Sequence, residues 1–206
     1  MRPDSVRRVE RLILVRHGES EYSARGLVNG DADVDVGLTP AGEEQARSLG
    51  RELAGEPIEL CVVSGLPRTR ATAELALARR GVPIEALPAF DDPHAGGFEG
   101  LPLDEYRSWA WSAGSAEEAP GGGESRRAIV ARYAAAYRSL LGRAEAVVLA
   151  VLHALPIAYV LESLDGSPPA PRMVRPIAYA QPYPLTAAEL RRALDVIDAW
   201  QEAPTW

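Results

Sequence analysis

The 206-residue chain has an ordinary globular composition, with 47% apolar and 25% charged residues. Its formal net charge of −7 argues against a general nucleic-acid binder, and no stretch approaches the roughly 20 apolar residues of a membrane span. At this length we expect one domain over residues 1–206. The single cysteine, Cys61, cannot form an internal disulfide, and the short basic and apolar start has no cleavage site. We therefore expect a soluble, cytoplasmic protein.

Short apolar runs predict the strands. They lie at residues 12–15, 60–63, 84–87, 147–151 and 177–180. The first, second and fourth are nearly continuous in apolar residues, which is typical of strands buried on both faces. The last lies near Pro176 and Pro182, so it is expected at an edge of the sheet.

Longer amphipathic runs between them predict helices. They cover residues 39–54, 68–79, 124–141, 156–164 and 186–200. Thr39 offers an N-cap with Pro40 at the first helical position, and Gly81 is a stop signal after the second run. Strands alternating with helices indicate a three-layer α/β/α sandwich with a mainly parallel central sheet.

Three predicted strands end in cationic or imidazole side chains. The first runs into Arg16 and His17, the second is followed by Arg68 at a helix start, and the fourth ends at His153. Carboxyl ends of strands and N-termini of helices both favour anion binding. Taken singly, these residues could be a surface turn or a core histidine, but together they indicate a phosphate-binding cage. Arg70 is expected to point to the surface.

The segments that contain these residues resemble those of a known family. LILVRHGES, SGLPRTRATAE and VVLAVLHALPI, in that order, resemble the signature segments of the histidine phosphatase superfamily. The resemblance is to its phosphoglycerate mutase-like branch, which includes α-ribazole phosphatases and the fructose-2,6-bisphosphatase domain. GLTPAGEEQA and the PGGGES loop resemble further segments of that branch.

The resemblance implies a phosphomonoesterase acting on a small-molecule phosphate ester. It implies that His17 attacks phosphorus and becomes phosphohistidine, while Arg16, Arg68 and His153 bind the phosphoryl oxygens. This division agrees with the physical demands of phosphoryl transfer, which are alignment and electrostatic stabilisation. We expect no cofactor and no metal, since the chain has no HExxH or CxxC motif.

The general acid departs from the family pattern, which has a glutamate four residues before the first glycine of a segment like ExxYGGxxG. Here that position is Asp92, in the segment FDDPHAGGFEG. Asp92 is the expected acid and Asp91 its competitor, whereas Glu99 is expected to be structural.

Other positions leave two interpretations open. The family often has asparagine at the position of Ser23, whose hydroxyl can still donate one hydrogen bond to phosphate. His94 contacts either substrate or solvent. Tyr106, Trp109 and Trp111, at helix-like spacing, either pack a helix on the core or line a substrate pocket.

Two other functions compete with phosphatase. A phosphoglycerate mutase uses the same histidine but returns the phosphoryl group to substrate, although such mutases are usually longer. A catalytically idle phosphate-binding module is the other, and the departures at Asp92 and Ser23 are its only support.

Overall fold

The computed structural model describes residues 8–206, so the first seven residues of the basic start lie outside it. Its sheet is built from β1 (Arg11–Arg16), β2 (Leu60–Val63), β3 (Ile84–Ala86), β4 (Val147–Leu152) and β5 (Pro182–Thr186). The strand order is β3-β2-β4-β1-β5, and only β5 runs antiparallel to its neighbour. The predicted α/β fold with a mainly parallel sheet is confirmed.

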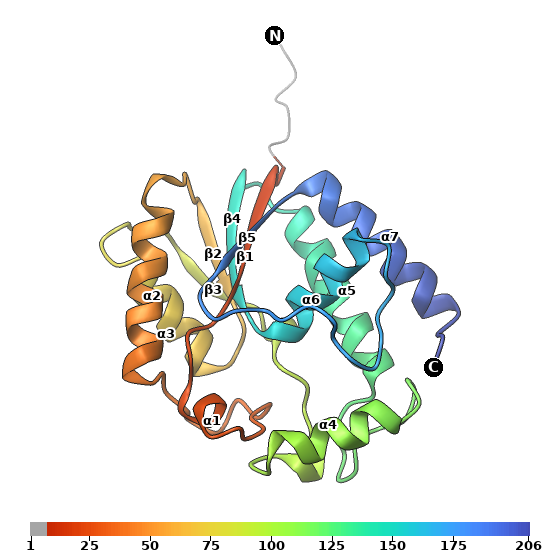
Figure 1. Ribbon diagram of the computed structural model, residues 1–206. Coiled ribbons are helices and arrows are strands. Elements are labelled where there is room, and N and C mark those ends of the chain that lie inside the picture. Colours follow the sequence, from red (N-terminus) through yellow and green to blue (C-terminus); the bar gives the residue numbers. More distant parts are fainter. Residues whose placement is uncertain (1–7) are drawn as a thin grey trace.

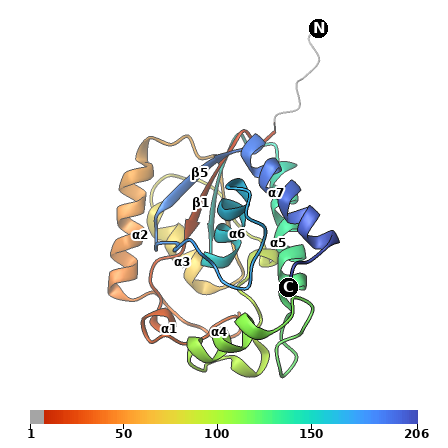
Figure 2. The ribbon, with the colours of Figure 1, turned by 45° about the vertical axis from the view of Figure 1, so that its right-hand side comes forward.

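Helices cover both faces of this sheet (Figure 1). The α-helices of residues 8–206 are α1 (Glu21–Ala24), α2 (Pro40–Glu52), α3 (Pro67–Ala76), α4 (Leu103–Ser112), α5 (Arg126–Leu141), α6 (Ala154–Leu164) and α7 (Ala187–Glu202). α2 and α3 lie on one face and α5, α6 and α7 on the other, as the turned view in Figure 2 also shows. Between residues 8 and 206, none of the helices is long and apolar enough to cross a membrane.

Alternation along the strands divides the core between these two faces. Leu12 and Leu14 pack with α5–α7, while Ile13 and Val15 pack with α2 and α3. β1, β2 and β4 are therefore apolar at successive positions, because both of their faces are covered. The N-caps at Thr39, Ser125 and Thr186 begin α2, α5 and α7, so the helix starts expected near 39 and 186 are confirmed.

The prediction of a late strand at 177–180 is wrong. Strand β5 lies at Pro182–Thr186 instead, with Pro184 opposite Ile13 and Pro182 opposite Val15. Prolines at alternate positions of an edge strand can keep their missing N–H groups on the unpaired side. Residues 177–180 cross the carboxyl end of β1, where the Ala180 N–H donates to the Arg16 carbonyl at 2.8 Å.

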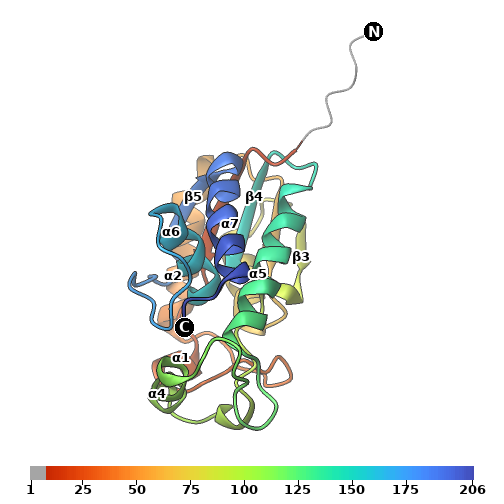
Figure 3. The same ribbon diagram turned by 90° about the vertical axis from the view of Figure 1, so that its right-hand side faces the viewer.

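The register brings the strand ends together. Arg16 pairs with Leu152 across β1 and β4, and Val63 pairs with Val151 across β2 and β4. His17 and His153 therefore follow directly after paired residues. Beyond these ends lie α1 and α4, at the opposite end of the sheet from the start of β1 (Figures 1 and 3).

Candidate active site

Two buried histidines meet where β1 and β4 end. His17 and His153 are 2% and 0% exposed, and their ring centroids lie 5.2 Å apart in an edge-to-face arrangement. His17 Nδ1 lies 2.7 Å from the carbonyl oxygen of Gly18, which can only accept a hydrogen bond. Nδ1 therefore carries the proton of the neutral ring, and Nε2 presents its lone pair.

Arg68, in the first turn of α3, joins both histidines. Its Nε donates to His17 Nε2 at 3.1 Å, and Nη2 lies 3.3 Å from His153 Nδ1. Nη1 and Nη2 also donate to the side-chain and backbone oxygens of Asn29, at 2.6 and 2.9 Å. His153 is fixed from the other side, since Nε2 lies 2.8 Å from the Ser64 hydroxyl. Arg68 is only 3% exposed, so its charge is held deep in the site.

Arg16 approaches the same place from the end of β1. Its Nη1 donates to the Ile177 carbonyl at 2.9 Å, and its guanidinium lies 3.8 Å from the ring centroid of Tyr179. The Tyr179 ring is in turn 5.9 Å from the His17 ring. Arg16 Nε is buried with no hydrogen-bond partner among the described residues, so this donor remains for a bound anion. We call Arg16, His17, Arg68 and His153 the strand-end cluster.

The cluster holds its imidazoles neutral. Burial lowers the pKa of His17 well below its ordinary value, and the nearby charge of Arg68 lowers it further. The same causes, in the same order, lower the pKa of His153. A neutral His17 with an unprotonated Nε2 is the form that can attack phosphorus.

Asp92 reaches the cluster and Asp91 does not. Asp92 Oδ2 accepts from Arg68 Nη2 at 2.8 Å and lies 3.3 Å from His153 Nδ1. The Asp91 carboxylate instead accepts the backbone N–H of Gly65, just ahead of α3. Burial raises the pKa of Asp91. Both carboxylates line a cavity of about 310 Å³, which Asp31, His94, Glu124 and Arg132 also line.

The structure confirms the structural interpretation of Glu99. Its two carboxylate oxygens accept the backbone N–H groups of Gly30 and Ala95, at 2.9 and 2.8 Å. Glu99 thereby ties the loop that carries Asn29 to the loop that follows Asp92. Arg70 is exposed, as expected.

Gly18 needs its small size because another segment of the backbone packs against it. A Cβ on Gly18 would lie 2.4 Å from the carbonyl oxygen of Gly42 in the first turn of α2. Space beside His17 is thus occupied by backbone of the protein itself, and the Gly18 N–H donates to the Thr72 hydroxyl at 3.0 Å. The glycine allows two segments to pack closely beside the nucleophile candidate.

Ser23 is the one expected phosphate ligand without a contact to the strand-end cluster. Its hydroxyl lies 2.9 Å from that of Ser20, the N-cap of α1. Sequence reasoning missed Asn29 and Tyr179, which hold Arg68 and Arg16. The Asn-Gly pair at 29–30 is a turn signal that could have pointed to Asn29, whereas no sequence motif marks Tyr179.

The entrance segment, residues 91–123, has its own small core. Tyr106 in α4 is 7% exposed and lies 5.7 Å from Phe98 and 5.8 Å from Trp109, centroid to centroid. This cluster is separate from the two sheet cores. Tyr106 and Trp109 therefore pack a helix on a core, which is the first of the two interpretations. Trp111 is exposed, and the guanidinium of Arg172 lies over its ring.

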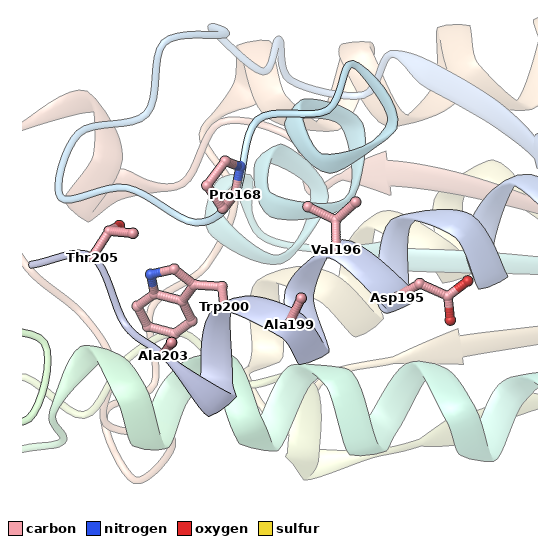
Figure 4. Close-up of a pocket in the computed structure, with 7 residues that line it drawn as sticks. All are labelled: Pro168, Asp195, Val196, Ala199, Trp200, Ala203 and Thr205. Carbon is pink, nitrogen blue, oxygen red and sulfur yellow. The ribbon is translucent and has the colours of Figure 1, made fainter.

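A second cavity, of about 450 Å³, lies beside α7 (Figure 4). It is lined by Pro168, Asp195, Val196, Ala199, Trp200, Ala203 and Thr205. These residues include no arginine or histidine, so a phosphate group would find no cation there. Within residues 8–206 no group of three or more His, Cys, Asp or Glu side chains is placed to hold a metal ion.

The family follows from comparison with known proteins. The Histidine phosphatase superfamily (branch 1) matches residues 12–199. The chain belongs to this superfamily. The match includes all four residues of the strand-end cluster and the entrance segment.

Members of the superfamily with different activities are similar to it. A 2,3-bisphosphoglycerate-dependent phosphoglycerate mutase of Methylobacterium radiotolerans is 35% identical over 170 residues, covering 75% of this chain and 79% of the mutase. An adenosylcobalamin/α-ribazole phosphatase of Salmonella typhimurium is 35% identical over 128 residues, covering 59% and 62%. In other curated mutases the matched part spans 37–62% of the relative's length.

A solved structure shows the same fold. A mycobacterial glucosyl-3-phosphoglycerate phosphatase in complex with VO3 superimposes with a TM-score of 0.70 at 26% identity, covering 86% of this chain and 92% of that one. The phosphoglycerate mutase-like fold expected for this superfamily is therefore confirmed.

Proposed function

We propose that the chain hydrolyses phosphate monoesters through a phosphohistidine at His17, without a metal ion or other cofactor. The observation that carries this proposal is the direction of the His17 lone pair. Nδ1 is committed to the Gly18 carbonyl, so Nε2 faces Arg68 and the rest of the strand-end cluster. A phosphoryl group bound there replaces the Arg68–His17 hydrogen bond and meets the lone pair directly.

In the first step, Arg16, Arg68 and His153 bind the phosphoryl oxygens and balance their charge. The His17 Nε2 lone pair forms the N–P bond while the P–O bond to the leaving group breaks. The ring gains positive charge, which the Nδ1–H hydrogen bond to the Gly18 carbonyl stabilises. Asp92 donates its proton to the departing oxygen.

In the second step, water displaces the imidazole. Asp92, now a carboxylate, accepts a proton as the water oxygen bonds to phosphorus. The N–P bond breaks, its electron pair returns to Nε2, and inorganic phosphate leaves. Asp92 lies beside a polar cavity, and its side chain is 30% exposed, so water can reach the phosphohistidine. This access favours hydrolysis over return of the phosphoryl group to substrate.

Phosphoglycerate mutase is the second candidate, because a mutase matches three quarters of this chain. The two activities are separated by product. Release of phosphate from p-nitrophenyl phosphate, unchanged by EDTA and inhibited by vanadate, supports a metal-independent phosphatase. Vanadate adopts the five-coordinate geometry of the transfer step, so a site built for that step binds it tightly. Interconversion of 2- and 3-phosphoglycerate that requires 2,3-bisphosphoglycerate, without net phosphate release, contradicts the proposal. Phosphate binding without turnover contradicts both.

The proposal includes action in the cytoplasm. Cys61 is buried, and burial raises the pKa of its thiol to about 12, so it stays an unreactive thiol suited to a reducing compartment. Fractionation of cells that express the tagged chain tests this; recovery with secreted or membrane fractions contradicts it.

A further inference from the structure

Two buried hydroxyl groups, those of Ser64 and Thr69, lie next to His153. Ser64 directly follows β2, and Thr69 is in the first turn of α3. They are 2% and 0% exposed, so each hydroxyl needs a partner inside the protein. Ser64 Oγ lies 2.8 Å from His153 Nε2 and 3.1 Å from Thr69 Oγ1. Ser64 therefore touches the strand-end cluster directly, although the proposed chemistry gives it no role.

The hydrogen atoms of this hydroxyl pair can be assigned from the acceptors around it. Each hydroxyl has one hydrogen to donate. Thr69 Oγ1 lies 2.9 Å from the Leu66 carbonyl oxygen, which can only accept, so Thr69 donates there. The Leu66 N–H in turn donates to Ser64 Oγ at 3.2 Å. Ser64 keeps its own hydrogen for Thr69 Oγ1 or for His153 Nε2, and Nε2 is the nearer of the two.

The surroundings of the other ring nitrogen decide between these two acceptors. His153 Nδ1 lies 3.3 Å from both Arg68 Nη2 and Asp92 Oδ2. Nη2 carries two hydrogens, and two oxygen atoms are closer to it than Nδ1 is. They are the Asn29 carbonyl oxygen at 2.9 Å and Asp92 Oδ2 at 2.8 Å. With both hydrogens of Nη2 used, Nδ1 is left to donate to the Asp92 carboxylate, and Nε2 accepts from Ser64.

The two histidines of the cluster then present opposite ends of the ring. Burial, and then the charge of Arg68, lowers the pKa of His153, so the ring is neutral near pH 7 and has a single N–H. A neutral imidazole can donate to an anion only through that N–H. His17 uses its Nδ1–H on the Gly18 carbonyl and turns its Nε2 lone pair into the cluster. His153 turns its N–H into the cluster instead.

We propose that Ser64 is a positioning residue, which keeps the proton of His153 on Nδ1 so that His153 donates a hydrogen bond to a phosphoryl oxygen. The inference rests on the proposed function and deepens it, since it assigns the atom of His153 that binds phosphate. A phosphoryl oxygen that enters the cluster replaces the Asp92 carboxylate as the acceptor of this N–H. Without the Ser64 hydroxyl, Nε2 loses its donor and the proton can move there. A lone pair would then face the phosphoryl oxygen and repel it.

Nuclear magnetic resonance of the ¹⁵N-histidine-labelled protein near neutral pH measures which ring nitrogen carries the proton. The chain has three histidines, and His17→Gln and His94→Gln assign the signals by removing one residue each. The wild type should show a protonated Nδ1 and an unprotonated Nε2 in His153. Ser64→Ala should show a protonated Nε2 in part or all of the molecules.

Thr69→Val is the matched control. It removes the neighbouring buried hydroxyl and its hydrogen bond to the Leu66 carbonyl, but leaves Ser64 Oγ free to donate to His153. Both variants should lower the melting temperature, because each loses a buried hydrogen bond. Only Ser64→Ala should move the proton, so the spectrum separates a positioning role from a structural one.

Titration of the same samples with inorganic phosphate tests the effect on binding. Ser64→Ala should bind phosphate about tenfold or more weakly, since a hydrogen bond to a charged group is lost. Thr69→Val should bind it within about twofold of wild type, because His153 keeps its N–H in the cluster.

Several outcomes would overturn the inference. One is a wild-type His153 with its proton on Nε2 or with two protons, and another is an unchanged proton position in Ser64→Ala. An equal shift in Thr69→Val would assign the effect to packing, and unchanged phosphate affinity in Ser64→Ala would show that Nδ1 does not bind phosphate. Neither measurement needs turnover. If the wild type does not hydrolyse p-nitrophenyl phosphate, the proposed function fails, and these two measurements still decide the role of Ser64.

Discussion

The strand-end cluster and the entrance segment are built in different ways. His17, Arg68 and His153 are at most 3% exposed, and adjacent parallel strands fix their positions through backbone pairing. The entrance segment has a small core of its own, and at its start Asp91 and Asp92 are half-buried and His94 is exposed. In the proposed mechanism the two regions therefore have separate roles. The strand ends supply the groups that bind and attack phosphorus, and the entrance segment supplies the acid, Asp92, which contacts them through Arg68 and His153. The predictions that follow test this separation.

The largest effect is expected at His17. His17→Gln keeps a polar side chain of similar length but removes the nucleophile, so turnover of every ester should fall by about 10⁴-fold or more. Alkali-quenched rapid mixing with labelled substrate should show a base-stable, acid-labile phosphoenzyme in the wild type and none in the variant. The control is His94→Gln, at the exposed histidine of the entrance. An active His17→Gln variant of unchanged melting temperature would contradict the mechanism.

The next effect depends on the leaving group. Asp92→Asn cannot supply a proton, so hydrolysis of an alkyl phosphate should fall by about 10²–10⁴-fold. Phosphorylation by p-nitrophenyl phosphate should fall much less, since nitrophenolate leaves without protonation. Single-turnover measurements compare the two.

Asp91→Asn is the matched control, because Asp91 is adjacent and lines the same cavity. It should show no such selectivity. If Asp91→Asn gives the selective loss instead, the proton comes from Asp91, whose raised pKa also suits an acid. Equal losses for both esters in Asp92→Asn would mean that Asp92 acts by binding and not as the acid.

How far the sequence predicts the site follows from the same contrast. The strand-end cluster could be predicted because apolar runs mark the strands, and parallel strands bring their carboxyl ends to one edge. Tyr179 could not, since its contact with Arg16 depends on where the chain turns after α6. Residues 177–180 have the composition of a strand, yet Ala180 adopts a positive φ of 48° and the segment crosses the sheet end. The sequence places Arg126 near the start of a predicted helix, but only the packing of the folded chain shows that it is buried.

A smaller effect is expected at Tyr179, which contacts the strand-end cluster. The Tyr179 ring stacks on Arg16, and such a contact is worth about 0.5–2 kcal/mol. Tyr179→Leu should therefore weaken inhibition by inorganic phosphate by about 2- to 30-fold, through loss of Arg16 positioning. Tyr179→Phe keeps the ring and should stay close to wild type. Equal weakening in both variants would assign the effect to the hydroxyl group and not to the stack.

The last effect concerns stability and pH, and leaves activity near neutral pH unchanged. The pKa values of His17 and His153 in the folded protein lie below the ordinary 6.5, because of burial and then the charge of Arg68. Below pH 6.5 the unfolded chain takes up protons that the folded chain does not. The contribution of these histidines to the free energy of unfolding should thus be complete above about pH 6.5. Below that pH the free energy of unfolding should fall, by up to about 1.4 kcal/mol per pH unit for each histidine.

Comparison with His17→Gln isolates one of these contributions, because the two proteins are otherwise identical in sequence. Urea unfolding from about pH 7 down to about pH 5 should show a shallower decline for the variant. The difference in unfolding free energy between the two proteins should therefore change with pH only below about pH 6.5. A parallel decline would mean that folded His17 accepts a proton as readily as the unfolded chain does. The cluster would then not hold a neutral nucleophile in acid, and activity would be lost as pH falls through 6.5. If the stability of the two proteins differs in pH dependence as expected, His17 stays neutral below pH 6.5. Any loss of activity in that range then comes from protonation of another group.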